Sequence, residues 1–289
     1  MNLMLRICGR LTNTETYVLM LKIPILFFLL KGVTSYRYLP DSLSVHFGPN
    51  FEPVTSARDV PHHVLIVYGS RYCSGSLIYS KIVVTAASCF VKHTDETVDI
   101  KMGANTITGI GQVIPVAEYK IHEYFKQLSA LDNDIALLVL QKNVKYETTV
   151  KKTLLVEPEI AIRENTNLLV AGWGGGTQLP MNYINLLLQL GAVVLKRSEC
   201  VQYYGQLMTP SNFCVRYTTD HFLTDNGGGA MFDDLLVGIL SVGEIKTDIR
   251  FNTAIVTNVS YFHRWITLNS KRFLKKYCIV QDKPNISLK

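Results

Sequence analysis

The chain has 289 residues, of which 48% are hydrophobic and 18% charged, and its formal net charge is +6. These values exclude a disordered polymer and provide enough apolar material for one large all-β domain or two small domains. The charge excess is small and no recognition motif accompanies it, so we expect no nucleic-acid partner.

The N-terminal segment has the features of an export signal. Ile23–Leu30 is apolar throughout, Lys22 precedes it, and small residues follow it just before Tyr36. We therefore predict a signal peptide over residues 1–35, with the signal proper at about 20–35. The residues before it are then either an upstream extension or a mis-assigned start.

A membrane anchor is the alternative for this segment. Counted from Tyr17, it holds 14 residues and includes Lys22 and Pro24, whereas a spanning helix needs roughly 20 apolar residues. We expect a secreted, extracellular protein with no transmembrane span. Export implies an oxidising compartment. Cys8 leaves with the signal, so five of the six cysteines remain, which allows two disulfides and one odd thiol.

After an extended lead-in over 36–53, the chain is a series of short β-type runs separated by turns. This spacing favours a sandwich or a barrel over βαβ units. The predicted strands include His63–Tyr68, Ile82–Thr85, Ile135–Leu140, Leu168–Ala171, Ala192–Leu195 and Leu236–Leu240.

One helix is predicted near the C-terminal end. Its apolar spacing runs from about Tyr261 to Leu268, with an extension to Leu274 as an alternative, and Ser260 is placed to cap its start. Residues 269–289 form a basic tail, which is either a solvated end or a contact for an acidic partner or a membrane surface. Its basic residues are Lys271, Arg272, Lys275, Lys276, Lys283 and Lys289.

Two Asn-X-Ser sequons make Asn258 and Asn285 glycosylation candidates. Asn258 lies where a strand is expected to meet the final helix, which would cover it in part. Asn285 lies in the tail, so accessibility favours Asn285.

Three segments carry the strongest functional signal. They are Cys73-Ser74-Gly75-Ser76-Leu77-Ile78 with Thr85-Ala86-Ala87-Ser88-Cys89, then Asp134-Ile135-Ala136-Leu137, then Thr224-Asp225-Asn226-Gly227-Gly228. In order and separation they resemble the trypsin-like (chymotrypsin-family) serine proteases, which show Cys-Gly-Gly-Ser-Leu-Ile, Thr-Ala-Ala-His-Cys, Asp-Ile-Ala-Leu and Gly-Asp-Ser-Gly-Gly. The segment Ala171-Gly172-Trp173-Gly174 agrees with the same family.

The resemblance covers roughly Val54–Leu268 and implies a trypsin-like serine protease domain over 54–268. Such a domain is all-β, with two six-stranded antiparallel β-barrels followed by a C-terminal helix. The barrels would span about 54–150 and 151–259, with the site between them.

The resemblance also assigns roles, and two of the three triad side chains differ from those of the family. Ser88 stands in place of the general-base His and Asn226 in place of the nucleophilic Ser, while Asp134 matches the Asp that orients the His. A serine hydroxyl is not a base near neutral pH, and a carboxamide nitrogen does not attack acyl groups. We therefore predict an inactive serine-type endopeptidase homologue.

The oxyanion-hole positions implied by the family are Thr224 and Asn226. The family has Gly at the first of these, and a β-branched residue resists unusual backbone angles. Loss of one donor typically costs about 10²–10³ in rate. None of the histidines of the body takes the base position, and no pair has metal-ligand spacing with cysteines, so we expect neither a metal nor another cofactor. These histidines are His62, His63, His93, His122 and His221.

Asp220 matches the floor of the family's primary specificity pocket, where an Asp selects Arg or Lys, and Ser241 and Gly243 match its wall. One hypothesis is a vestigial pocket that binds a basic side chain. The alternative is a coincidental loop carboxylate. The family closes this loop with a disulfide whose first position is Phe222 here, so the loop is free to rearrange.

The resemblance implies the disulfides Cys73–Cys89 and Cys200–Cys214 and leaves Cys278 unpaired within the chain. Cys278 either pairs between chains or remains free. No activation-type sequence follows an Arg or Lys near Phe47–Pro49, so we predict no zymogen cleavage. Asp225, which binds the new amine in the family, then needs another partner.

A retained fold with altered catalytic positions predicts a secreted protein that acts by binding. Its partners would be secreted proteins such as proteases or protease inhibitors, and it would serve as cofactor, decoy or regulator. One alternative is a structural or surface-attached extracellular component, held by the basic tail or by Cys278. The other is a residual serine-type endopeptidase.

Overall fold

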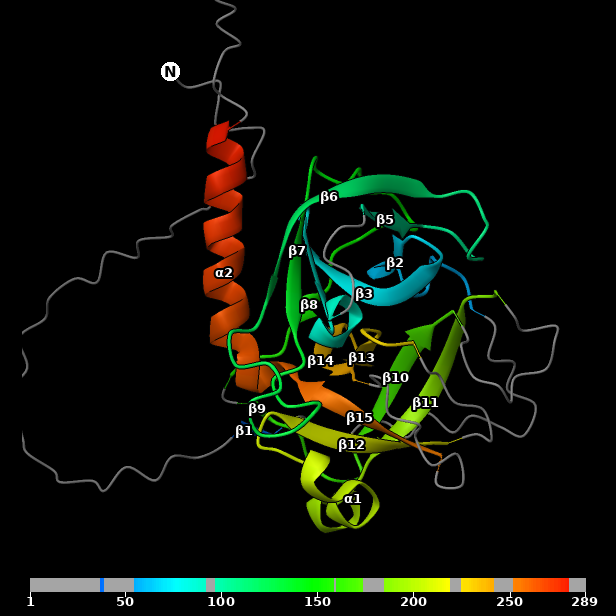
Figure 1. Ribbon diagram of the computed structural model, residues 1–289. Coiled ribbons are helices and arrows are strands. Elements are labelled where there is room, and N and C mark those ends of the chain that lie inside the picture. Colours follow the sequence, from blue (N-terminus) through cyan, green and yellow to red (C-terminus); the bar gives the residue numbers. More distant parts are fainter. Residues whose placement is uncertain are drawn as a thin grey trace, which may run out of the picture. The chain divides into compact units, whose positions relative to one another are not determined.

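A computed structural model describes residues 37–38, 55–91, 97–158, 160–173, 185–218, 225–241 and 252–280 (Figure 1). Its contacts divide the chain into two units. Residues 36–274 contain every described strand, and the other unit comprises 1–35 and 275–289. The expected signal peptide and the end of the basic tail lie outside the described residues.

Six antiparallel strands form a first closed barrel in the order β2-β3-β4-β7-β6-β5. β2 and β5 pair from Val64 with Met102 to Tyr68 with Val98, which closes the ring. The strands are β2 (His63–Tyr68), β3 (Arg71–Tyr79), β4 (Ile82–Thr85), β5 (Val98–Met102), β6 (Gln112–Ile121) and β7 (Ala136–Leu140). A short 3-10 helix, η2 (Ala87–Phe90), follows β4.

A second barrel is closed because β13 pairs with both β10 and β14. Its strands are β10 (Asn167–Gly172), β11 (Leu188–Val194), β12 (Asn212–Tyr217), β13 (Gly229–Phe232), β14 (Leu235–Leu240) and β15 (Thr253–Asn258). β8 (Leu154–Leu155) adds to β14 in parallel, and β1 (Arg37–Tyr38) pairs in parallel with β9 (Ile160–Ala161). The two six-stranded antiparallel barrels predicted from the sequence are therefore present.

Buried apolar residues fill both barrels, and in the first barrel the burial differs from strand to strand. β7 is buried at all five positions, whereas β5 alternates buried and partly exposed residues along Val98–Met102. A continuous apolar run suits a strand covered on both faces, and alternation suits one that meets solvent on one face.

In the described ranges, three helical segments follow strands of the second barrel. The helix α1 (Arg197–Tyr204) continues into the 3-10 helix η4 (Gly205–Leu207), and α2 (Val259–Val280) follows β15 directly. Among the described residues, no helix is long and apolar enough to cross a membrane.

The start of α2 differs from the prediction that Ser260 caps it. Asn258 is the residue before the helix, and its side-chain Oδ1 accepts a hydrogen bond from the Ser260 backbone N–H at 3.1 Å. An N-cap side chain bonds a backbone N–H of the first turn, and Asn258 has that role. The Ser260 hydroxyl instead donates to the Pro158 carbonyl at 3.0 Å.

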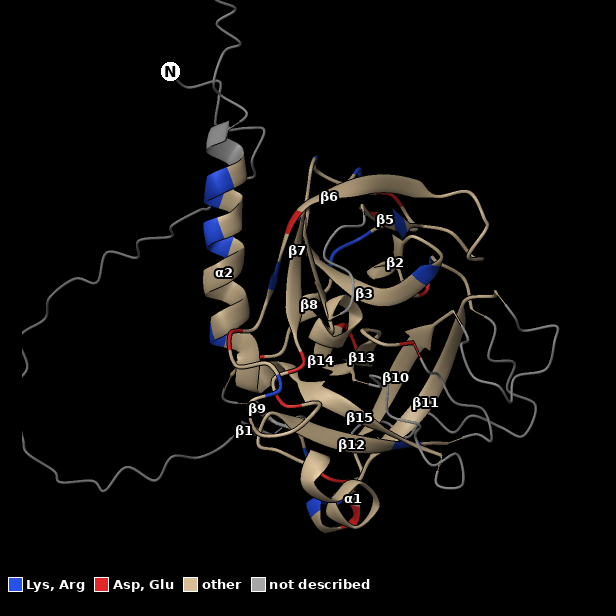
Figure 2. Ribbon diagram, in the orientation of Figure 1, with Lys and Arg blue, Asp and Glu red and all other residues tan. Residues whose placement is uncertain are grey.

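The end of α2 also lies beyond the boundary expected at Leu268. Asn269, Ser270 and Phe273 are buried, so part of the presumed tail packs as the helix's inner face. Five cationic side chains and no acidic one lie along the helix (Figure 2). They are Arg264, Lys271, Arg272, Lys275 and Lys276, and all are exposed.

Candidate functional site

The three triad positions come from separate elements of the two barrels. Ser88 lies in η2 after β4, and Asp134 lies just before β7, both in the first barrel. Asn226 lies in the turn before β13 of the second barrel. The fold therefore brings together residues that are up to 138 positions apart in sequence.

A chain of hydrogen bonds connects these side chains. Asn226 Nδ2 donates to Ser88 Oγ at 2.5 Å, and Ser88 Oγ donates to Asp134 Oδ2 at 2.8 Å. The Ser88 backbone N–H also donates to Asp134 Oδ1 at 2.7 Å. From the second barrel, Ser241 Oγ donates to Asp134 Oδ2 at 2.6 Å.

The environment of Asp134 limits its chemistry. Burial raises the pKa of this carboxyl, and hydrogen bonds from Ser241, Ser88 and the Ala87 backbone act in the opposite direction. A carboxylate offers about four lone-pair sites, and here two hydroxyl and two backbone donors use them. Ser88 and Asp134 do form a hydroxyl–carboxylate pair, but a carboxylate is far too weak a base to take the proton of a serine hydroxyl near neutral pH.

A tight turn sets the position of Asn226. Gly227 follows it with φ +88°, and a Cβ there would collide with the Ser74 carbonyl oxygen and with Thr85 Oγ1. The Ser74 N–H donates to the Asn226 carbonyl at 2.9 Å. The Asn226 main chain is therefore tied to strand β3, and its amide lies 3.5 Å from Cys89 Sγ.

Asp225 has partners other than a newly formed chain terminus. Its Oδ1 accepts the Trp173 backbone N–H at 2.8 Å and the Ser74 hydroxyl at 3.3 Å. The side chain also fills the space where a Cβ on Gly172 would lie. This arrangement is compatible with the prediction that the chain is not activated by cleavage, which stays a prediction.

The described histidines lie outside this network. His62 and His63 are buried at the start of β2, and the His63 ring lies 5.9 Å from the Trp173 ring. Burial lowers the pKa of His62 to about 4 and that of His63 to about 3, so both are neutral near pH 7. In the described ranges, no group of His, Cys, Asp or Glu side chains is arranged to hold a metal ion.

Both disulfides implied by the family resemblance are formed. Cys73–Cys89 joins β3 to η2, directly beside Asn226, and Cys200–Cys214 joins α1 to β12. The first of these holds Ser88 and the β3 backbone in fixed relation.

Several predicted residues lie outside the described ranges. They are Thr224 of the oxyanion hole, Asp220 and Gly243 of the specificity pocket, His93, His221, Phe222 and Asn285. The same holds for the side chain of Cys278. The vestigial pocket and the state of Cys278 therefore stay predictions.

The sequence did not reveal the roles of Ser241, Thr257 and Ser74. Ser241 was predicted to lie in a pocket wall, which stays a prediction, and its hydroxyl donates to Asp134. Thr257 Oγ1 donates to the Asp134 carbonyl at 2.9 Å. For Ser74 a signal was available, because Cys73-Ser74-Gly75 carries a serine where the family shows glycine.

Comparisons with known proteins agree with this architecture. The family profile described as Trypsin matches residues 52–266. Hypodermin-B of Hypoderma lineatum is 31% identical over 224 residues, which is 75% of this chain and 85% of that protein. A trypsin of Sus scrofa is 31% identical over 217 residues, or 73% of this chain and 90% of that protein.

Two solved structures share the fold. They are the scabies mite inactivated protease paralogues S-D1 and S-I1, with TM-scores of 0.68 and 0.66 at 21% and 23% identity. Each alignment covers 75% of this chain, and 95% or 98% of the other. The profile match over most of the chain, together with the similarity to hypodermin-B, shows that this chain belongs to the trypsin family.

Proposed function

We propose that this chain is a secreted, non-catalytic member of the trypsin family that acts by binding other proteins, as a cofactor, decoy or regulator of proteases or their inhibitors. The observation that carries the proposal is the hydrogen bond from Asn226 Nδ2 to Ser88 Oγ. This bond joins Asn226, at the position of the family's nucleophile, to Ser88, at the position of its general base. Neither side chain is a serine–imidazole partner of the kind that the family uses for catalysis. Loss of a complete triad costs on the order of 10⁶ in rate.

Retention of the fold supports a binding role. Both barrels, both disulfides and the buried Asp134 persist although the reaction they served in the family lacks its base and nucleophile. A relative that keeps this fold but lacks the base and the nucleophile can in principle bind the inhibitors of active family members, which is an argument by analogy. The scabies mite relatives, described as inactivated protease paralogues, are a precedent by analogy.

A competition assay tests the decoy role. Active trypsin is mixed with a protein inhibitor, and increasing amounts of the purified chain are added. A decoy releases trypsin activity as it takes up inhibitor, whereas a panel of peptide substrates shows no turnover by the chain alone. Turnover that disappears in Asp134→Ala would instead support the residual peptidase. If inhibition is unchanged throughout, and no protease or inhibitor is captured from extracellular fluid, the binding proposal fails.

The exposed cations of α2 favour a second candidate, a surface-attached component. Arg264, Lys271 and Lys275 are separated by seven and four residues, so they lie on one side of the helix. A surface-attached protein would lose retention on an anionic surface in the Arg264→Gln/Lys271→Gln/Lys275→Gln variant. The control is Lys142→Gln/Lys151→Gln/Lys152→Gln, which removes three exposed charges elsewhere. Equal retention of the two variants argues against attachment through α2.

A further inference from the structure

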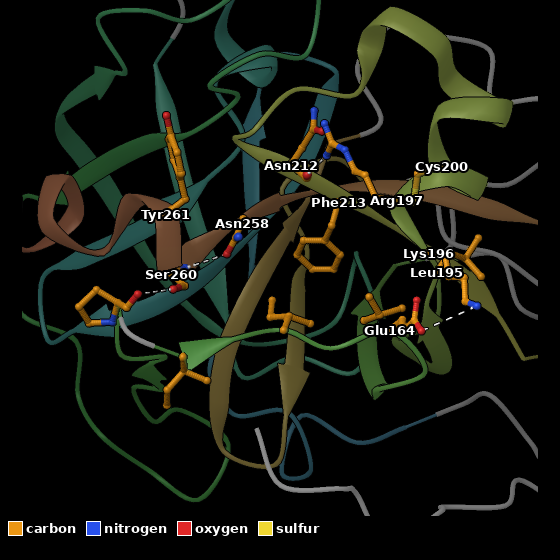
Figure 3. A pocket seen from close by; sticks show the side chains of 14 residues that line it. Glu164, Leu195, Lys196, Arg197, Cys200, Asn212, Phe213, Asn258, Ser260 and Tyr261 are labelled. Carbon is orange, nitrogen blue, oxygen red and sulfur yellow. Dashed lines mark hydrogen bonds and ion pairs between the residues drawn. The ribbon is translucent and has the colours of Figure 1, made fainter. Parts of the chain in front are cut away.

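A pocket of about 480 Å³ lies against the second barrel, where β15 turns into α2. Its volume is within the range of about 300–1,000 Å³ that is usual for small-molecule sites. Phe213 and Leu195 give it an apolar floor, and Glu164, Lys196 and Arg197 give it a charged edge. Its lining also includes both Asn258 and Ser260, the acceptor and the hydroxyl residue of a glycosylation sequon (Figure 3).

The two ends of the Asn258 amide are used differently. Oδ1 accepts the Ser260 N–H and caps α2. Within the described part of the chain, Nδ2 makes no hydrogen bond, and it is not among the side-chain nitrogens that are buried without a partner. Nδ2 therefore keeps some contact with solvent, and Asn258 is one of the residues that line the pocket. A glycosylated asparagine keeps Oδ1 and one N–H, so the cap survives when a sugar is attached.

The surroundings of Nδ2 suit a sugar ring. In the view of Figure 3, Phe213 lies between Asn258 on one side and the ion pair of Glu164 with Lys196 on the other. Tyr261, which is 57% exposed at the start of α2, is also among the lining residues, and its ring points away from Phe213 in Figure 3. Aromatic rings can cover the apolar face of a pyranose while charged groups at the edge bond its hydroxyls.

We propose that Asn258 carries an N-linked glycan and that its first N-acetylhexosamine occupies this pocket. The inference rests on passage through a glycosylating secretory compartment, which is part of the proposed function. In the transfer, Asn258 Nδ2 forms a bond to C1 of a lipid-pyrophosphate-linked sugar, the bond from C1 to the pyrophosphate oxygen breaks, the lipid pyrophosphate leaves, and Nδ2 loses one proton to a base. This proposal differs from the expectation based on accessibility, which favoured glycosylation at Asn285 over Asn258.

The test is expression of the chain in a eukaryotic host, once with its own residues 1–35 and once with a generic export signal in their place. Peptide mass spectrometry after enzymatic glycan release then reports on Asn258. Asn258→Asp keeps the capping oxygen and is expected to lose one glycan, whereas Ser260→Thr keeps the sequon and the glycan. Asn285→Asp is the matched control. An unmodified Asn258 behind the generic signal overturns the proposal, and failure of export with residues 1–35 alone argues only against the secretory prediction.

Occupation of the pocket has its own readout. A first sugar held against Phe213 is expected to be released by a glycosidase at least about tenfold more slowly from the native protein than from the denatured protein, which corresponds to about 1.4 kcal/mol. The variant Phe213→Ala is expected to remove this protection in protein that is still folded by circular dichroism. Equal release from native and denatured wild type overturns the assignment of the pocket.

Discussion

Asp134 is fully buried, and its carboxylate is the centre on which hydrogen bonds from both barrels converge. Ser88 reaches it from the first barrel and Ser241 from the second. In an active relative this carboxylate orients an imidazole. Here it accepts hydrogen bonds from buried hydroxyl and backbone donors, so its removal should be felt in stability.

We predict that Asp134→Ala lowers the free energy of unfolding by about 2–4 kcal/mol, because it leaves buried donors unpaired and opens a cavity. Asp99→Ala on strand β5 is the control, since Asp99 is only partly buried, and it should change stability by less than about 0.5 kcal/mol. Urea unfolding of both variants measures the difference. Equal effects would mean that the network contributes nothing to stability.

The adjacent histidines His62 and His63 predict loss of stability in acid. Burial is the main cause of their lowered pKa values, about 4 and about 3, while Asp234 opposes the shift at His62. A depressed folded pKa means that the unfolded chain binds protons first as pH falls. The free energy of unfolding therefore decreases as pH falls from about 6.5, the unfolded pKa, towards the folded pKa values of His62 and His63. The raised pKa of Asp134 acts in the opposite direction above its unfolded value.

His63→Leu isolates one of these contributions. Between about pH 7.5 and pH 5, the wild type should lose about 2 kcal/mol more than this variant, since each pKa unit is worth 1.36 kcal/mol. Asp134 is present in both proteins, so its effect cancels in the comparison. Parallel profiles for wild type and His63→Leu would contradict the assignment.

At the scale of elements, α2 continues past Leu268, the residue at which the domain was predicted to end. The Asn269 side chain donates to the Trp265 carbonyl at 2.9 Å, and Phe273 is 6% exposed. We predict that a chain ending at Leu274 unfolds like the full chain. A chain ending at Leu268 should lose about 2–3 kcal/mol, mainly the burial of Phe273. Thermal unfolding of the two truncations, with Phe273→Ala as a third sample, separates helix length from burial. Identical midpoints would restore the boundary at Leu268.

The same elements show what the sequence can predict. The predicted strands His63–Tyr68 and Ile82–Thr85 match β2 and β4 residue for residue. Short apolar runs rich in β-branched residues and bounded by turns are typical of strands, so these could be predicted from sequence. The expected end at Leu268 and the alternative end at Leu274 both fall short of Val280, where α2 ends. Asn269 and Ser270, although buried, are polar, and the lysines after them resemble a solvated tail. Local pattern does not report which polar groups find partners in the folded chain.

In the candidate site, too, some features could be predicted from the sequence and others could not. The positions of Ser88, Asp134 and Asn226 followed from motif order, and the structure brings them together. The bond from Ser241 to Asp134 spans 107 residues. Such a long-range contact depends on how two barrels meet, and no local pattern encodes it.

For the whole molecule, the contacts between the barrels predict that they unfold together. The Asp134 carbonyl accepts Thr257 Oγ1, and Ser211 Oγ donates to Asp132 Oδ1 at 3.0 Å. The Ser74 N–H meets the Asn226 carbonyl at 2.9 Å. These bonds are all between the first and second barrels, and neither barrel can open at the junction without leaving buried polar groups unpaired.

The two tryptophans report on this junction from different places. Trp173 lies against His63 of the first barrel, and Trp265 of α2 donates through Nε1 to Glu123 in the β6–β7 connection at 2.7 Å. We predict that Trp173→Phe and Trp265→Phe, each with one tryptophan left, show fluorescence transitions in urea at the same midpoint as far-UV circular dichroism of the same variant. Coincident probes are the mark of a two-state transition. Two separated transitions would mean that the barrels are independent folding units, and that the network at Asp134 joins them in the native state without coupling their stability.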